Sequence, residues 1–258
     1  MSRLRGNAMK VLVCVKHVID VAELKIDPKT RAPILTGVPY KISDFDKNAL
    51  EEAIKMKEGG ASVSVVSVGP ERVKECLKEA LAIGADEAFA VITETYDTLA
   101  NSKALAKAIE KIGFDLVICG EASIDSYSAQ MVPSLAERLG IPQLTYAQKI
   151  SLNDGGVEVE RDMEDGIEVV EADLPAIVSV VKTINEPRLP TIMQILAASK
   201  KAITAWSLED IGIGEDLAAE MGVAVTENIS PPSERKGVIF EGDDAVKQLA
   251  NVLAKEVG

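Results

Sequence analysis

The chain has 258 residues, 47% of them hydrophobic, and a mean hydropathy of +0.12, which suits one large α/β domain with an added arm. Only 3% of the residues are aromatic, so the core must be built from aliphatic side chains. The formal net charge of −13 argues against nucleic acid as a partner, because binding it requires a cationic surface that displaces counterions.

Three scattered cysteines and one histidine carry little chemistry in this pattern. Cys14, Cys76 and Cys119 form no C-x-x-C pair, which is typical of reduced thiols in a cytoplasmic protein and predicts no metal site. We interpret His17 as a polar residue at the end of a strand and not as a catalytic base.

No stretch of the sequence predicts direct insertion into a membrane, since no apolar run reaches the ~20 residues that a spanning helix needs. Residues 1–8 contain two arginines but no apolar segment of a secretory signal. We interpret them as a leader or a cloning remnant, because the first strand pattern begins only at Met9.

Strand and helix patterns alternate through the first half of the chain. Four apolar runs predict buried strands, at 10–16, 62–69, 87–92 and 116–120. Four stretches with helical spacing predict helices, at 45–60, 70–86, 98–113 and 128–140. This alternation predicts a doubly wound, mainly parallel, Rossmann-like sheet, which binds ligands at the carboxyl ends of its strands.

The segment GEASIDSYSAQ (120–130) lies at that edge of the predicted sheet, between a buried strand and a helix. Small and hydroxyl residues before a helix start suit a phosphate group, because the first helical N–H groups are unpaired and the dipole end is positive. An ordinary strand-to-helix turn explains the same residues, so the segment alone leaves both interpretations open.

The pattern changes after the fourth helix. Residues 148–182 contain turn signals between alternating runs, which predicts an antiparallel insertion and a last strand that returns to the sheet. Residues 9–187 therefore form the nucleotide-binding α/β domain in our interpretation. Residues 188–258 have too few apolar clusters to bury a core, and we expect a C-terminal arm that wraps around a partner.

One stretch resembles the signature of the β subunit of electron-transfer flavoproteins. It is VERDMEDGIEVVEADLPAIVS (159–179), in which Arg161, Glu168 and Pro175 occupy characteristic positions. The order of VLVCVKHVID, ALAIGAD, GEASID and INEPR (184–188) along the chain is also similar to that family.

The resemblance implies an electron carrier without catalytic residues of its own. Such a β subunit pairs with an α subunit, which carries most contacts to a redox-active FAD. The heterodimer takes electrons from acyl-CoA or other dehydrogenases and passes them to a membrane quinone oxidoreductase or another acceptor. The β subunit itself binds AMP in the simpler members and a second FAD in the electron-bifurcating members, which oxidise NADH.

The resemblance also implies site residues. Carried over position by position, the nucleotide would contact Cys14, Ser43, Asp44, Phe45, Asp46, Val68, Ile124, Asp125, Ser126, Tyr127, Ser128, Ala129 and Gln130. Ser43-Asp44 stands where the family often has Asn-Pro. Asp125 would either accept a hydrogen bond from a ribose hydroxyl or brace the loop.

Residues 184–201 resemble the loop with which the β subunit docks on its partner. Ile192 stands at the position of the aliphatic anchor in that loop, with Ile195 and Leu196 beside it. In the alternative interpretation, these three side chains form the buried face of a helix.

The stretch YDTLANSKAL (96–105) resembles the bifurcating and nitrogen-fixation-associated members. Asp97 would cap the helix, and Thr98 would turn a polar group toward the nucleotide. We therefore favour a second FAD over AMP in this subunit. Two other functions remain as alternatives, a universal-stress-type nucleotide-binding or sensing domain and an α/β enzyme with Asp125 or His17 as its base.

Overall fold

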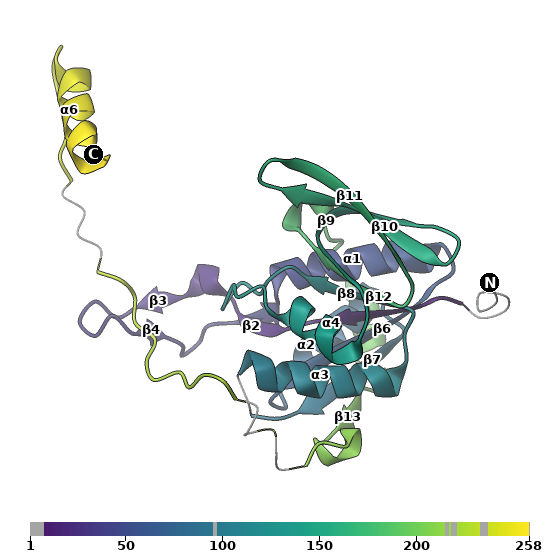
Figure 1. Ribbon diagram of the computed structural model, residues 1–258. Helices are drawn as coiled ribbons and strands as arrows, with labels where there is room; N and C mark the ends of the chain where they lie inside the picture. The colour runs from purple at the N-terminus through teal and green to yellow at the C-terminus, as the bar shows by residue number, and fades with distance from the viewer. Residues whose placement is uncertain (1–7, 95–96, 215–216, 218–220, 233–236, 258) are drawn as a thin grey trace. The chain divides into compact units, whose positions relative to one another are not determined.

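The computed structural model describes residues 8–94, 97–214, 217, 221–232 and 237–257. These residues group into two compact units (Figure 1). The first consists of 1–24 and 35–226, and the second of 25–34 and 227–258. Residues 1–7, most of the segment interpreted as a leader or cloning remnant, lie outside the described residues.

Nine strands of the described residues form one sheet in the first unit. Their order is β11 (Gly166–Asp173), β10 (Gly156–Met163), β9 (Gln143–Leu152), β12 (Ala176–Val180), β8 (Leu116–Gly120), β1 (Lys10–Cys14), β6 (Ser62–Gly69), β7 (Glu87–Ile92) and β13 (Thr204–Trp206). In this spatial order, the two pairs formed by β11, β10 and β9 are antiparallel. All the other neighbouring pairs, from β9–β12 to β7–β13, are parallel. The predicted mainly parallel sheet with an antiparallel insertion is confirmed, although β9 begins earlier than residue 148.

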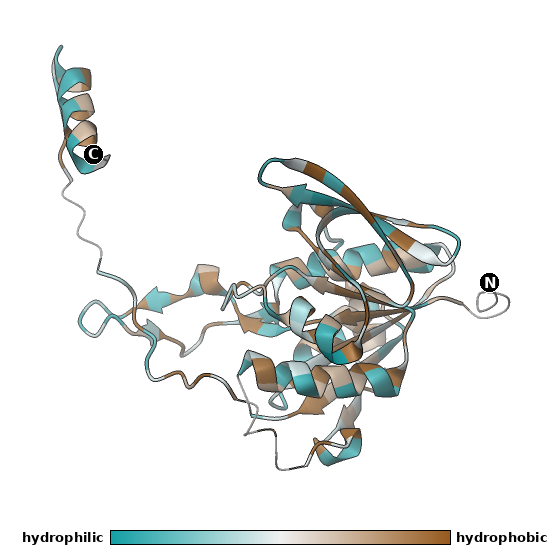
Figure 2. Ribbon diagram, in the orientation of Figure 1, coloured by the Kyte–Doolittle hydropathy of each residue, from teal (hydrophilic) through white to brown (hydrophobic). Residues whose placement is uncertain are grey.

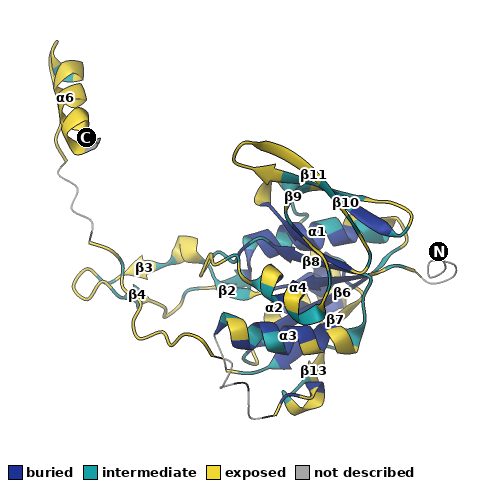
Figure 3. Cartoon of the chain, viewed as in Figure 1, coloured by how far each residue is buried: buried dark blue, intermediate teal, exposed yellow. Residues whose placement is uncertain are grey.

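Helices cover both faces of this sheet. They are α1 (Asp44–Glu58) and α2 (Val73–Ile83) on one face, and α3 (Thr98–Ile112) and α4 (Met131–Leu139) on the other. Side chains of β1 alternate between the two cores: Val11 and Val13 pack with α1 and α2, whereas Leu12 packs with α3 and α4. Because both faces are covered, the central strands are buried along their length (Figure 3), which explains their continuous apolar runs.

Two of the predicted helices are shorter than their sequence patterns suggested. The pattern at 70–86 forms α2 only from Val73, and the pattern at 128–140 forms α4 only from Met131. Residues 128–130 therefore belong to the loop before α4. Pro133 lies in the first turn of α4, where its missing N–H costs no helical hydrogen bond.

The sequence patterns did not predict the short elements between β1 and α1. In the first unit, β2 (His17–Ile19) pairs antiparallel with β5 (Tyr40–Ile42), and a short 3₁₀ helix, Val21–Glu23, follows β2. In the second unit, β3 (Lys25–Ile26) pairs antiparallel with β4 (Pro33–Ile34). These strands are too short to give a readable alternation.

The first part of the predicted arm belongs to the first unit. Residues 188–226 include α5 (Ile192–Ala198), strand β13 and a 3₁₀ helix, Glu209–Ile211. Trp206 of β13 stacks on Phe89 of β7 with ring centroids 5.1 Å apart. Ile211 is buried in the core that α3 covers. Within the segment 188–258, the residues from 227 onward belong to the second unit.

The second unit contains the β3–β4 hairpin, the chain from 227 onward and helix α6 (Ala245–Val257). Within it, the Ser230 N–H donates to the Arg31 carbonyl at 2.8 Å. Helix α6 carries apolar residues along its length (Figure 2). Val246 and Leu253 on this helix are exposed. This unit buries little apolar surface of its own.

The single tryptophan tests whether β13 is part of the folded sheet. We expect Trp206 fluorescence and far-UV circular dichroism of the isolated chain to give the same urea midpoint, since β13 pairs with β7 and its tryptophan is packed against Phe89. A fluorescence transition at clearly lower urea would instead identify β13 as part of a loosely attached arm.

Candidate functional site

A cavity lies at the carboxyl ends of the central strands. β1 stands between β8 and β6, so the chain leaves this point toward both sides of the sheet, the position at which doubly wound sheets bind ligands. Seven residues that the sequence assigned to a nucleotide site line the cavity, namely Cys14, Asp46, Val68, Thr98, Ser126, Ser128 and Ala129. The strands, α1, α3 and the loop before α4 each contribute to this set.

Several other residues that the sequence assigned to the site do not line the cavity but contact one another beside it. The Ser43 hydroxyl accepts a hydrogen bond from the Ile124 N–H at 3.3 Å, which joins the chain before α1 to the loop after β8. The Phe45 ring meets the Tyr127 ring edge-on, with centroids 5.6 Å apart. Tyr127 has φ +47, a left-handed conformation that is uncommon for a non-glycine residue. These residues shape the loop without lining the cavity.

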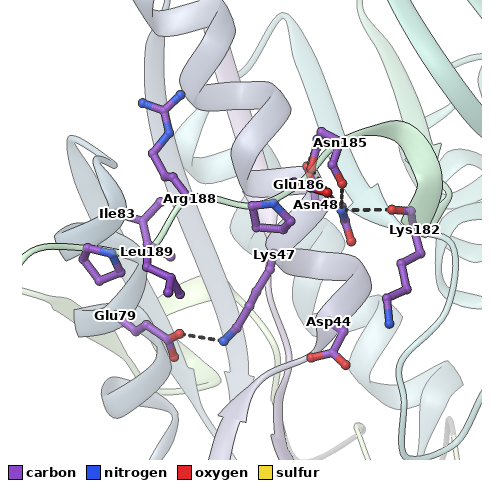
Figure 4. A pocket seen from close by; sticks show the side chains of 12 residues that line it. Asp44, Lys47, Asn48, Glu79, Ile83, Lys182, Asn185, Glu186, Arg188 and Leu189 are labelled. Atoms are coloured by element: carbon purple, nitrogen blue, oxygen red, sulfur yellow. Dashed lines mark hydrogen bonds and ion pairs between the residues drawn. The ribbon is translucent and has the colours of Figure 1, made fainter.

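Asp44 and Gln130 are also outside the cavity lining. Asp44 lies 3.1 Å from the Lys41 ammonium and lines a different pocket on the α1 face of the sheet (Figure 4). Gln130 is exposed, and its carbonyl accepts the Ser134 N–H in the first turn of α4.

Asp46 is a buried carboxylate that ties three elements together. Its two oxygens accept hydrogen bonds from the Lys16 N–H after β1, at 2.8 Å, and from the Gly120 N–H at the end of β8, at 3.2 Å. Burial raises the pKa of Asp46 to about 7, although both N–H groups favour the charged form. The first turn of α1 is thereby fixed to the cavity floor.

Lys16 is a cavity residue that the sequence reasoning missed. Its ammonium lies 2.8 Å from the Asp125 carboxylate and also donates to the Ser123 hydroxyl at 3.3 Å. Burial alone would raise the pKa of Asp125, but the hydrogen bonds from Lys16 and Ser123 hold it below its usual value. In this structure Asp125 thus braces the loop. The available signal was a lysine directly after the first strand, at the ligand-binding edge.

Asp97 caps α3, as predicted, and makes a second contact. One oxygen accepts the Ala100 N–H at 2.9 Å, which is the helix cap. The other accepts the N–H groups of Gly222 and Val223 at 3.3 and 3.2 Å. Burial acts to raise the pKa of Asp97, but these hydrogen bonds lower it overall. The Asp97 carboxylate is thus used by the first turn of α3 and by residues 222–223, whereas its neighbour Thr98 lines the cavity.

The lining of the cavity combines polar and apolar groups. The start of α3, where the helix dipole is positive, contributes Thr98 and Asn101, and Lys16 contributes an ammonium that is paired with Asp125. His17 does not line the cavity: the side chain is buried, its ring centroid lies 5.1 Å from that of Tyr40, and burial lowers its pKa. His17, which would be the base in the alternative interpretation as an α/β enzyme, therefore does not reach this cavity.

The predicted docking residues are exposed on α5. The exposed fractions are 77% for Ile192, 50% for Ile195 and 56% for Leu196, whereas Ala198 on the same helix is buried. The alternative in which these three side chains form the buried face of a helix is wrong for this chain by itself.

Comparison with known proteins gives the family. The electron transfer flavoprotein domain matches residues 34–211. The electron transfer flavoprotein subunit beta of Thermoanaerobacterium thermosaccharolyticum is 41% identical over 254 residues, 95% of this chain and 98% of the relative. The CarD subunit of the caffeyl-CoA reductase-Etf complex of Acetobacterium woodii is 38% identical, over 96% and 97% of the two chains. Protein FixA of Azorhizobium caulinodans is 36% identical, over 81% and 79%.

An α/β sheet with a cavity at its switch point, together with these matches, defines a flavoprotein subunit of electron transport. The chain belongs to the electron transfer flavoprotein β-subunit family, and its role is that of an electron carrier and not of a conventional enzyme. Within the described residues, none of the helices combines the length and apolar character that a membrane crossing requires.

The close approach of Gly120 to α1 predicts a sensitive position. A Cβ at this residue would come within 2.6 Å of both the Asp46 carboxylate and the Phe45 Cβ. We expect Gly120→Ala to destabilise the protein by about 1–3 kcal/mol through overpacking, measured by urea unfolding. Gly214→Ala, where the added Cβ would meet open space and φ is not positive, separates this clash from the general effect of replacing a glycine.

Asp46 predicts a pH dependence of stability. Folding raises its pKa from 3.8 to about 7, so the folded protein binds this proton more tightly than the unfolded chain. The contribution of Asp46 to the free energy of unfolding should therefore fall as the pH rises from about 4 to about 7, and then level off. Urea titrations across this range should show a smaller decline for Asp46→Asn. An equal decline in both proteins would contradict the assignment.

Proposed function

We propose that this chain is the nucleotide-binding half of a cytoplasmic heterodimer. It pairs with an electron-transfer flavoprotein α subunit, and the redox-active FAD is shared between the two. The heterodimer takes electrons from dehydrogenases of the acyl-CoA or another class and delivers them to a membrane quinone oxidoreductase or another acceptor. The observation that carries this proposal is a cavity with both polar and apolar lining at the switch point of a family fold.

The residues present fit a nucleotide phosphate. Ser126 and Ser128 offer hydroxyl groups, the start of α3 offers its dipole, and Lys16 offers an ammonium group that it shares with Asp125. Cys14 and Val68 supply an apolar wall. Asp46 holds the backbone of β1 and β8 in place beneath the ligand.

A second FAD suits this cavity better than AMP. Thr98 and Asn101 at the start of α3 add polar groups on one side, and a diphosphate needs more donors than a single phosphate. When bound, FAD supplies reversible uptake and release of electrons. The chain's own residues would bind and orient it, and NADH would approach it as the electron donor.

The released nucleotides decide between the two forms. We expect the denatured heterodimer to release two FAD and no AMP, as measured by chromatography against standards. One FAD and one AMP per heterodimer would make this chain the subunit of a simple carrier. No adenine nucleotide beyond the shared FAD would refute the assignment of the cavity.

The exposed face of α5 is the proposed contact for the dehydrogenase. Ile192→Ala should raise the KM for the heterodimer about tenfold and leave its flavin content unchanged, since burying such a side chain contributes about 1.5–3 kcal/mol. Ile167→Ala removes an isoleucine on β11 that is 62% exposed, compared with 77% for Ile192, and serves as the control. Equal kinetics for both variants would contradict docking through α5.

A further inference from the structure

The segment that leads into α5 is fastened to α1 (Figure 4). The Asn48 side-chain amide donates to the Asn185 carbonyl at 2.8 Å and to the Lys182 carbonyl at 3.1 Å. Asn185 in turn donates to the Asn48 carbonyl at 3.0 Å and to the Glu52 carboxylate at 2.9 Å. Asn48 is buried, so these bonds satisfy polar groups that water cannot reach.

One turn further along α1, Glu51 holds Arg188. The Glu51 side chain is only 6% exposed, and its two oxygens accept from the Arg188 Nε, Nη2 and backbone N–H at 2.8–3.1 Å. The remaining side of the guanidinium reaches Glu58 at 2.8 Å. Burial acts to raise the pKa of Glu51, but the bonds from Arg188 bring it below its usual value.

By itself, the Glu51–Arg188 ion pair adds little to the free energy of unfolding. Burying a carboxylate costs free energy that an ion pair only partly returns, and an apolar pair of similar size is often as stable. What the paired guanidinium provides is geometry, because its planar donors fit both carboxylate oxygens in one orientation. Arg188 stands three residues before Thr191, whose side chain and Gln194 form the capping box that begins α5.

α5 depends on this attachment. It has seven residues, too few to be stable by itself in water, and among its described side chains only Ala198 is buried. Its apolar residues face outward, together with Leu189, which is 86% exposed. The orientation of this exposed face must therefore come from the residues that precede it and from its contact with α2.

We propose that Glu51 and Arg188 are positioning residues for docking, which fix the direction in which α5 presents Ile192 to the partner. The inference rests on the proposed docking function of α5 and extends it to residues that do not touch the partner. The bidentate contact sets the path of the chain from Arg188 to Thr191. The amide contacts of Asn48 and Asn185 fix the turn before it.

The test uses the intact heterodimer carrying Glu51→Gln. Amide hydrogen exchange of residues 191–199 should become at least tenfold faster, because glutamine cannot accept from Arg188 at both positions. With a reduced acyl-CoA dehydrogenase as the probe, the KM for the heterodimer should rise about tenfold while kcat and nucleotide content stay unchanged. Arg188→Lys, which keeps the charge but loses the planar bidentate donors, should shift exchange and KM in the same direction.

Glu110→Gln is the matched control, since it removes an exposed carboxylate paired with Lys107 on α3. A lower unfolding temperature for Glu51→Gln with unchanged exchange and KM would overturn the positioning role. If Ile192→Ala raises the KM and Glu51→Gln does not, the docking function stands and this inference fails. If Glu51→Gln speeds exchange and Ile192→Ala leaves the KM unchanged, Glu51 orders α5 but the docking function fails, and the positioning role in docking fails with it.

Discussion

The hydrogen bonds of the Asp46 carboxylate are the constraint on which the site depends. Two N–H groups from the ends of β1 and β8 meet one side chain from the first turn of α1. Gly120 has no side chain, which lets the backbone of β8 approach Asp46 and Phe45 closely. A buried carboxylate is costly, and its raised pKa shows that the two N–H groups return only part of that cost. The remainder is carried by the packing of α1 on the sheet.

Helix α1 serves two surfaces from one rigid body. Its first turn contributes Asp46 to the cavity floor, and its following turns hold Asn185 and Arg188 at the start of the docking segment. At 15 residues it is about 22 Å long, and its apolar side chains are packed against the central strands. The proposed nucleotide site and the proposed docking segment are therefore attached to the same helix.

The loop from 121 to 130 forms one side of the cavity. Lys16 reaches it from β1 and pairs with Asp125, while Ser43 holds the Ile124 N–H. With these groups occupied, Ser126, Ser128 and Ala129 are left facing the cavity. Asp125, which suggested a ribose contact, is used to shape the loop. Family membership also makes the universal-stress alternative unnecessary, because the matched domain covers most of the sheet.

Much of the fold was fixed by local sequence patterns. Continuous apolar runs such as 116–120 could only be buried on both faces, and the turns between 148 and 182 dictated antiparallel strands. The role of Asp97 as a helix cap could also be predicted from the local sequence, because its partner is only three residues away. Only tertiary structure decided the pairing of β13 with β7, the place of Lys16 and the Glu51–Arg188 contact. These join residues up to 137 positions apart, and no pattern within one segment records a partner that lies on another.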